Sequence, residues 1–275
     1  MIFNIKHKTI FSYNNAPLSA IQKLRITPMD QGNQKIINWN IEVNGCTIEL
    51  ETYDFQGNKI HLCKTINDTK KIEITSYGKL EIEDTNGIVG SHKSSVPIDL
   101  FKFSSSKYTY AGPYTKKLVS DLFKNINKKT ISDLELLNFL SKNILLKVKY
   151  LKGKTNIKTT AEDSLGLGYG VCQDHVHIFL ASTRLLGYPS RYVSGYLMLN
   201  DMNIQEASHA WAEVYIENLG WVGFDPTNRC CPDERYIRVS CGLDSSYAAP
   251  IRGIVNGGVK ESLDIDVQTL EVSTQ

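Results

Sequence analysis

The sequence predicts an α+β fold in which an N-terminal antiparallel β-sandwich precedes a core of helices packed on an antiparallel sheet. Up to about residue 85, short segments alternate apolar with polar residues and are separated by Gly/Asn turns. From Pro113 onward, helical patterns come first and strand patterns follow. We therefore divide the 275 residues into a β domain, residues 1–97, and a core, residues 98–275.

The β domain is predicted from a series of strand and turn signals. Residues 37–43 alternate apolar with polar side chains, which is the period of a half-buried strand. Asn44-Gly45 follows, and this dipeptide is the strongest short signal for a hairpin turn. The alternation resumes at residues 48–52, and Gly57-Asn58 predicts a second turn, so we expect a small sandwich. The same alternation continues through three apolar pairs: Ile60 and Leu62, Ile72 and Ile74, and Leu80 and Ile82.

The core is predicted to begin with helices. Pro113 is a favourable first residue for a helix. Ser132, followed three residues later by Glu135, forms a capping box for a second helix. Thr160 can cap a short third helix, and a fourth is expected over roughly residues 171–186. Four strands are then expected, over about residues 188–199, 208–216, 221–226 and 236–240.

Charge and hydrophobicity exclude several classes of function. The net charge is +2 and the lysines are scattered, so no surface for a polyanion such as nucleic acid is predicted. No stretch approaches the roughly 18 apolar residues that span a membrane. The N-terminus alternates apolar and polar residues, which is unlike a secretion signal. We therefore expect a cytoplasmic protein with neither a nucleic-acid nor a membrane partner.

The chain has six cysteines. In the absence of an export signal, reduced thiols are the expected state, although Cys46 and Cys63 could form a disulfide if their strands pair. There is no CxxC spacing, and the adjacent Cys230 and Cys231 suit no single metal ion. We therefore expect no metal and no cofactor.

Cys172 follows Gly168-Tyr169-Gly170 at the predicted start of the fourth helix. A free thiol, with a pKa of about 8.5, is mostly neutral at pH 7, whereas nucleophilic chemistry needs the thiolate. The unpaired amides and the dipole of a helix N-terminus favour negative charge at that position. We expect the glycines to let backbone N–H groups approach an acyl oxygen, with the amide of Cys172 as first donor. For a second donor the sequence offers only Tyr169 and residues 160–164.

A histidine and an aspartate on two later strands complete a candidate nucleophilic site. His209 lies near the start of one predicted strand and Asp225 near the end of the next. Cysteine, histidine and aspartate are a thiol nucleophile, its base and the group that orients the base. His209 and Asp225 can meet only if they share a face of the sheet. In a regular hairpin this requires an odd number of residues between Tyr215 and Trp221.

These residues also have structural interpretations. A lone cysteine is usually a small buried core residue, and Asp225 before Pro226 could simply form a turn. His175 is a rival base because it lies three residues after Cys172 on the same helix face. His177 is expected to be structural, since its ring diverges from that of His175 and the pair makes a poor metal site.

Around these residues the sequence resembles the transglutaminase-like superfamily, whose fold is a variant of the papain-like cysteine hydrolase fold. Residues 1 to about 85 are similar to the β domain that precedes this core in a bacterial subgroup, so the likeness covers most of the chain. The core segments that carry it are residues 159–162 and 187–196, Gly170-Val171-Cys172-Gln173-Asp174, Ser208-His209-Ala210-Trp211-Ala212-Glu213-Val214-Tyr215 and Gly220-Trp221-Val222-Gly223-Phe224-Asp225-Pro226-Thr227-Asn228. Outside the core, residues 7–13, 24–28, 236–239 and 242–244 contribute.

The resemblance implies that Cys172 is the nucleophile, His209 the base and Asp225 the orienting acid. It disfavours His175 as base. Family members often carry an aromatic residue where His175 stands and an arginine where Leu243 stands. These departures change the surroundings of the thiolate and the cleft rim without removing a member of the triad.

The function predicted from this site is cysteine-dependent acyl transfer, most simply hydrolysis of a peptide or amide bond through a thioester. Bacterial proteins of this layout are generally described as candidate cysteine peptidases. The alternatives are a transglutaminase, in which an amine resolves the thioester, and a non-catalytic module that binds peptides by strand addition. A metal hydrolase ranks last. The expected partner is a peptide or protein substrate.

Overall fold

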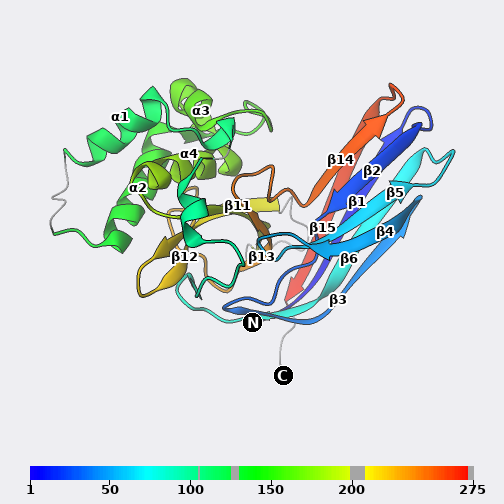
Figure 1. Cartoon of the computed structure of the whole chain (residues 1–275), viewed down its shortest axis with the longest axis horizontal. Helices are drawn as coiled ribbons and strands as arrows, with labels where there is room; N and C mark the ends of the chain where they lie inside the picture. Colours follow the sequence, from blue (N-terminus) through cyan, green and yellow to red (C-terminus); the bar gives the residue numbers. More distant parts are fainter. Residues whose placement is uncertain (105, 125–129, 199–207, 272–275) are drawn as a thin grey trace.

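The computed structural model describes residues 1–104, 106–124, 130–198 and 208–271. Two lobes lie side by side: a sandwich of long strands, and a mixed lobe in which helices cover one side of a sheet (Figure 1). This is the predicted α+β architecture, and the prediction is confirmed.

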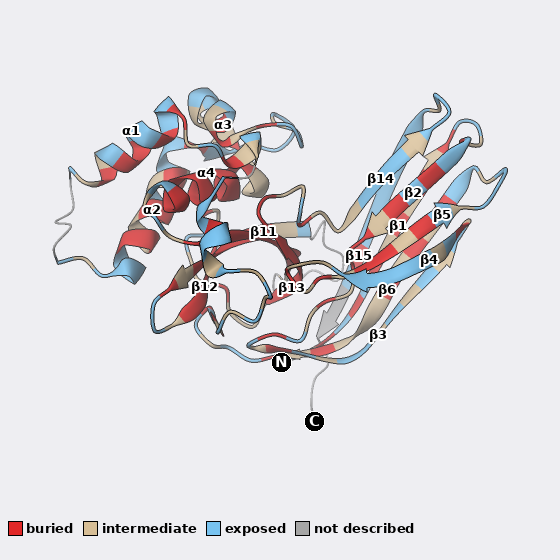
Figure 2. Ribbon diagram, viewed as in Figure 1, coloured by how far each residue is buried: buried red, intermediate tan, exposed pale blue. Residues whose placement is uncertain are grey.

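The first lobe is an antiparallel sandwich because its strands alternate inward apolar with outward polar side chains. Figure 2 shows the same strands with buried and more exposed residues interspersed. Inward-facing Phe3, Phe11, Ile72, Ile74 and Leu80 are almost fully buried. One sheet has the strand order β15 (Glu261–Glu271), β1 (Ile2–Tyr13), β6 (Lys71–Ile82) and β3 (Gln34–Asn44). The other has the order β14 (Ile251–Asn256), β2 (Ser19–Leu24), β5 (Lys59–Thr65) and β4 (Cys46–Tyr53).

The prediction of a hairpin at Asn44-Gly45 is wrong. β3 pairs with β6 and β4 pairs with β5, so the turn carries the chain from one sheet of the sandwich to the other. Gly45 allows this with a φ of 78°, and a Cβ there would lie 2.2 Å from the carbonyl oxygen of Lys71. The second predicted turn, Gly57-Asn58, does close the hairpin between β4 and β5 and is confirmed.

The expected boundary between the domains also needs correction. β14 pairs with β2 and β15 pairs with β1, so residues 251–271 complete the sandwich rather than the core. Conversely, β7 (Ile88–Gly90) pairs with a strand of the core sheet. The sandwich is therefore built from both ends of the described chain. In β15, Leu263, Ile265 and Val267 alternate with polar residues, and this pattern supplies the missing inward face.

The second lobe packs helices against a five-stranded sheet. Within the described residues its α-helices are α1 (Pro113–Leu122), α2 (Asp133–Lys147), α3 (Ala161–Leu167) and α4 (Cys172–Leu185), and its 3₁₀ segments are η1 (Ile98–Lys102) and η2 (Lys107–Thr109). The sheet order is β13 (Tyr236–Gly242), β10 (Ser190–Leu197), β11 (Ser208–Ile216), β12 (Gly220–Phe224) and β7. A short parallel pair, β8 (Lys149–Tyr150) with β9 (Tyr169–Gly170), precedes α4.

The predicted helix starts are confirmed by their caps. Pro113 is the first residue of α1. The Ser132 hydroxyl accepts a hydrogen bond from the amide of Glu135 at 3.3 Å, which is the predicted capping box. The predicted strand over 188–199 is observed as β10, and its last predicted residue lies outside the described part of the chain. α4 is almost wholly buried and packs on β11 through Ala210 and Ala212.

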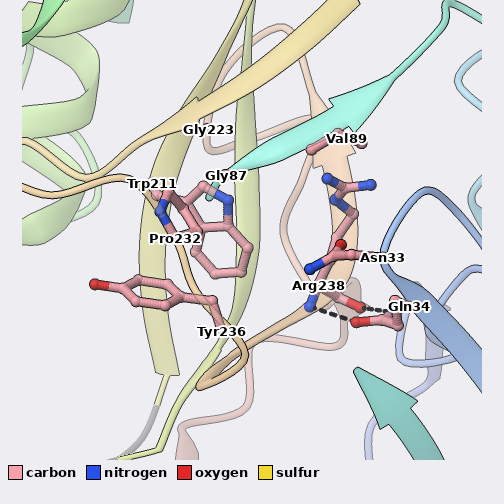
Figure 3. Close-up of a pocket in the computed structure, with 9 residues that line it drawn as sticks. All are labelled: Asn33, Gln34, Gly87, Val89, Trp211, Gly223, Pro232, Tyr236 and Arg238. Atoms are coloured by element: carbon pink, nitrogen blue, oxygen red, sulfur yellow. Dashed lines mark hydrogen bonds between the residues drawn. The ribbon is translucent and has the colours of Figure 1, made fainter. Parts of the chain in front are cut away.

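Two amide side chains of the sandwich dock on the free edge of β13. Gln34 accepts a hydrogen bond from the Arg238 amide and donates one to the Arg238 carbonyl oxygen, both at 2.9 Å (Figure 3). Asn58 does the same at Cys241, with distances of 2.9 Å and 2.7 Å. Each pair satisfies the N–H and C=O of one extended residue, so the edge of the core sheet is closed by the other lobe.

A buried ion cluster lies behind this contact. Glu213 of β11 has no solvent exposure and pairs with Arg191 of β10, whose Nε donates to Oε2 at 2.7 Å. Arg238 of β13 donates to the other carboxylate oxygen of Glu213 and, at 3.0 Å, to Gln31 of the sandwich. The cluster links three strands of the core sheet to the first lobe.

Candidate active site

The first residue of α4 is Cys172, which is partly exposed. The carboxylate of Asp174 accepts from the Val171 amide at 2.8 Å and from the Thr155 hydroxyl at 2.6 Å, and this holds the start of the helix. The amide of Cys172 belongs to the first helical turn, where N–H groups have no intrahelical partner. The thiol therefore sits at the positive end of a long helix dipole.

The glycines before Cys172 also have roles that were not expected from the sequence. Gly168 ends α3 in the left-handed conformation, with a φ of 75°. A Cβ on Gly170 would lie 2.7 Å from the Cβ of Asp174, so Gly170 makes room for the capping carboxylate. Both glycines therefore shape the turn that fixes the direction of α4.

His209 and Asp225 lie on the same face of the sheet, as the predicted hairpin requires. Tyr215 pairs directly with Trp221, which confirms the same-face register, and Ala212 pairs with Phe224. His209 Nε2 lies 2.6 Å from Asp225 Oδ2. This contact leaves Nδ1 as the ring nitrogen available to the thiol.

Asp225 is fully buried and its carboxylate is saturated with hydrogen bonds. Oδ1 accepts from the amides of Thr227 and Asn228, at 2.8 and 3.1 Å. Oδ2 accepts from the side chain of Asn228 at 2.7 Å and from the hydroxyl of Tyr236 at 2.9 Å, in addition to His209. Burial raises the pKa of Asp225, but the bonds to His209 and Asn228 outweigh it, so the net shift is downward and the group stays ionised.

His209 is held in its charged form. Burial lowers the pKa of its imidazole, but hydrogen bonds to Asp225 and Cys172, and the charges of both, raise it to about 9. The ring lies between a carboxylate and a thiol, so a proton on it is stabilised from both sides. The charged ring is thus placed between the buried carboxylate of Asp225 and the thiol at the start of α4.

A pH-dependent contribution of His209 to stability follows. The folded-state pKa of about 9 lies above the ordinary value of 6.5. The stabilisation is therefore complete below pH 6.5 and is lost as pH rises to about 9. We expect the difference in unfolding free energy between the wild type and His209→Gln, measured with urea, to be larger at about pH 6 than at about pH 9.5. Equal differences at the two pH values would contradict this ion pair.

Cys172 and His209 open into a cavity of about 710 Å³ that lies between the two lobes. Its lining includes Tyr192 from β10 and Gln173 from α4, together with residues of β1, β2, β14 and β15. The volume is within the range of about 300–1,000 Å³ that is typical of ligand sites. The sandwich therefore forms one wall of the cleft that contains the thiol.

Tyr192 places a hydroxyl-bearing side chain in this cavity, which the sequence did not reveal. Its side chain is almost buried but lines the cavity. Burial first, and then the charges of Cys172 and Asp174, raise its pKa well above the ordinary value, so the hydroxyl keeps its proton. The signal was absent from the sequence because the position lies inside an ordinary strand pattern. Tyr169 and residues 160–164, which the sequence offered, do not line the cavity.

The rival base His175 is buried with both ring nitrogens occupied. Nδ1 lies 3.1 Å from the Thr227 hydroxyl and Nε2 lies 3.0 Å from the Val148 carbonyl oxygen. Burial lowers its pKa. It supports the segment that follows Asp225 and faces away from the cleft, so His209 is the imidazole at the thiol. His177 is likewise buried, stacked on Tyr108.

Other features bear on alternative chemistries. Neither Cys230 nor Cys231 lines the cavity, and the six cysteines are free thiols. Among the residues described, no group of three or more His, Cys, Asp and Glu side chains could hold a metal ion. No helix in the described ranges has the length and apolar character needed to cross a bilayer.

Two family models match the chain. Residues 118–226 match the model described as "Transglutaminase-like superfamily", and this range contains Cys172, His209 and Asp225. Residues 3–81 match the model described as "Bacterial transglutaminase-like N-terminal region". The two ranges coincide with parts of the two lobes.

Similar proteins match nearly the whole length of the chain. An uncharacterised protein of Mycobacterium leprae (strain TN) is 27% identical over 274 residues, which cover 96% of each chain. One of Mycobacterium tuberculosis (strain ATCC 25618 / H37Rv) is 25% identical over 98% of this chain and 92% of the relative. A crystal structure named as a "Putative Cysteine Protease" from Cytophaga hutchinsonii superposes with a TM-score of 0.75 at 22% identity, covering 100% of this chain and 92% of that one. That likeness shows the fold.

Proposed function

Since this chain belongs to the transglutaminase-like superfamily, we propose that it is a cysteine-dependent enzyme that hydrolyses a peptide or amide bond. The observation that carries the proposal is the charged His209, bonded to buried Asp225 and adjacent to Cys172 at the start of α4. We further propose that it acts in the cytoplasm, where its six cysteines would remain free thiols.

Acylation begins at the thiolate of Cys172. Its sulfur attacks the substrate carbonyl carbon, and the carbonyl oxygen takes up the negative charge. The amide of Cys172 and the hydroxyl of Tyr192 are the proposed donors to that oxygen. His209 then gives its proton to the leaving nitrogen, the C–N bond breaks, and a thioester remains on Cys172. Asp225 keeps the imidazole oriented during the transfer.

Deacylation needs a nucleophile, such as water, that attacks the thioester and can give up a proton to His209. Neutral His209 takes this proton from water, the oxygen attacks the thioester carbon, and the C–S bond breaks to return the thiolate. A primary amine would follow the same steps and give a new amide. We propose water because it is abundant and needs no dedicated binding pocket.

The proposal is tested with a peptide library and mass spectrometry. The wild type and Cys172→Ala are incubated with the library, with and without an added primary amine. We expect backbone cleavage or side-chain deamidation by the wild type alone, each with its own mass change. An amine adduct would assign the transglutaminase reaction instead. If neither protein changes the library and iodoacetamide labels Cys172 no faster than the other five thiols, the protein is a binding module.

Tyr192 gives a second, smaller prediction. If its hydroxyl supports the oxyanion, Tyr192→Phe removes one donor without changing the shape of the ring. We expect kcat to fall by about 10–100-fold, KM to change little, and the rate of Cys172 alkylation by iodoacetamide to stay the same. Equal losses in catalysis and alkylation would instead assign Tyr192 to positioning the thiol. The matched control is Tyr247→Phe, because Tyr247 does not line the cavity.

A further inference from the structure

The cavity extends well beyond the thiol, into the interior of the sandwich. Its wall includes Phe11 of β1, Gln22 of β2, and residues of the edge strands β14 and β15. The two edge strands belong to different sheets and are joined by the segment 257–260. In Figure 1, β14 lies on the side of the sandwich that faces the helical lobe. The sandwich is therefore open along this edge and continuous with the candidate active site.

The inward face of this edge exposes apolar side chains. Leu263 and Ile265 of β15 pair with Phe11 and Thr9 of β1, which are inward-facing residues. Even so, Leu263 is 50% exposed and Ile265 is 54% exposed. Side chains at equivalent positions in a closed sandwich would be covered by the opposite sheet. We call this surface, formed by Phe11, Leu263, Ile265 and the neighbouring residues of β14, the edge groove.

A single unpaired amide lies in the edge groove. Gln22 is 1% exposed, and its Nε2 and Oε1 make no hydrogen bond of normal geometry, although the Tyr13 hydroxyl lies close enough to interact with them. Of the cavity-lining side chains that the structure describes, it alone has buried polar atoms in this state. The other buried polar groups of this wall are paired: His7 contacts the Tyr196 hydroxyl at 2.5 Å and the Thr9 hydroxyl at 3.0 Å.

The neighbouring strand is shaped around this amide. Gly253 of β14 pairs with Gln22 across the sheet. A Cβ on Gly253 would lie 2.0 Å from Oε1 of Gln22. The amide therefore occupies the space that a side chain at residue 253 would fill, and it lies over the edge strand beside the opening.

The same chain shows what such an amide binds. Gln34 and Asn58 each make a two-point contact with the N–H and C=O of one extended residue, at Arg238 and Cys241. Gln22 has the same donors and acceptor, is equally buried, and bonds to no backbone group. An extended residue from another chain would complete the third such contact.

We propose that the edge groove binds an extended, apolar stretch of the polypeptide substrate, with Gln22 bonded to the backbone N–H and C=O of one of its residues. This rests on the proposed function, because the same cavity contains Cys172 and His209. Leu263 and Ile265 contact the apolar side chains of the bound stretch. Arg252 and Glu261 line the cavity with opposite charges. The groove therefore has no excess charge that would favour an acidic or a basic peptide. The enzyme thus recognises unfolded or extended chain at a distance from the bond it cuts.

The test compares small and peptide-linked reagents that alkylate the same thiol. Iodoacetamide reports on Cys172 alone. Tripeptidyl chloromethyl ketones and bromoacetyl tripeptides extend from the thiol in opposite directions, and each is made with leucines or with aspartates. We expect the leucine form of one series to react with Cys172 at least about tenfold faster than its aspartate form. No gain in either series would overturn the groove.

Variants test whether the faster reaction of the leucine reagent depends on residues of the edge groove. We expect Gln22→Leu, Gly253→Ala and Leu263→Asp each to lower the rate with the leucine reagent by about tenfold and to leave the iodoacetamide rate unchanged. The matched control is Ile254→Asp, on the outer face of β14 and 78% exposed. If Gln22 serves only as a neighbour of the Tyr13 hydroxyl, Gln22→Leu leaves the reagent rates unchanged and the role of Gln22 is overturned.

The outcomes separate this inference from the function it rests on. Slow labelling of Cys172 by iodoacetamide in the wild type would contradict the enzyme itself. Rapid iodoacetamide labelling without any effect of leucine, Gln22→Leu or Leu263→Asp would contradict the groove alone. Since Leu263 is half exposed, Leu263→Asp is expected to fold even if Gln22→Leu does not.

Discussion

Replacement of His209 by alanine is expected to lower kcat/KM for acyl transfer by about 10³–10⁴-fold. The variant loses the proton donor for the leaving group and the positive charge beside Cys172, while the buried carboxylate of Asp225 keeps its bonds to Thr227, Asn228 and Tyr236. The measurement uses the substrate identified from the peptide library, with iodoacetamide labelling of Cys172 at about pH 6.5 as a second readout. We expect labelling to slow as well, because the imidazolium that favours the thiolate is gone.

Two other histidines serve as controls for this prediction. His92→Ala removes a ring that contacts the Val96 carbonyl oxygen, outside the cleft, and is expected to leave kcat/KM unchanged. His175→Gln is expected to lower stability, since His175 is buried between Thr227 and Val148, but to retain activity per folded molecule. Loss of activity in folded His175→Gln with full activity in His209→Ala would reverse the assignment of the base.

A large loss of stability is expected from Glu213→Gln. The neutral amide would leave the guanidinium groups of Arg191 and Arg238 buried without their counter-charge. Breaking such a buried pair typically costs about 3–5 kcal/mol. We expect the unfolding free energy, from urea titration at pH 7, to fall by about 3 kcal/mol or more. The exposed Glu217→Gln is the control, expected to change it by less than about 0.5 kcal/mol.

The lowered pKa of Glu213 also predicts how the unfolding free energy changes at acidic pH. Burial raises the pKa of Glu213, but the charges of Arg238 and Arg191 outweigh this and hold the pKa below the ordinary value of 4.5. Its stabilisation is therefore present above pH 4.5 and is lost as pH falls through the lowered value. If the unfolding free energy of Glu213→Gln equals that of the wild type at pH 7, the ion pairs of Glu213 do not stabilise the fold and the cluster stabilises it only through packing.

Local signals in the sequence were sufficient for the helices. Pro113 and the Ser132 capping box work through contacts within one turn of chain, so their chemistry is visible in a few consecutive letters. The same holds for the position of Cys172 at the start of α4. Catalytic roles for Cys172, His209 and Asp225 remain proposals, but the contact between His209 and Asp225 follows from a strand register that could be worked out in advance.

Contacts between segments that are distant along the chain could not be predicted from the sequence. Asn44-Gly45 is compatible with a hairpin and with a crossing between sheets, and the pairing of β3 with β6 decides between them. Leu263, Ile265 and Val267 show the alternation of a strand, but nothing local states that their partner is β1. The proposed donors Tyr192 and Gln22 were missed for the same reason, because their significance depends on which residues lie opposite them.

The pairing of β1 with β15 sets an order of events during synthesis. β1 can pair with β6 early in synthesis, but its other neighbour, β15, is made more than 200 residues after β1, once the whole helical lobe has been synthesised. Until then, one edge of each sheet is unprotected and available for association with other nascent chains. A chain that ended before residue 251 would therefore keep Cys172 and His209 but lack two strands that line their cavity.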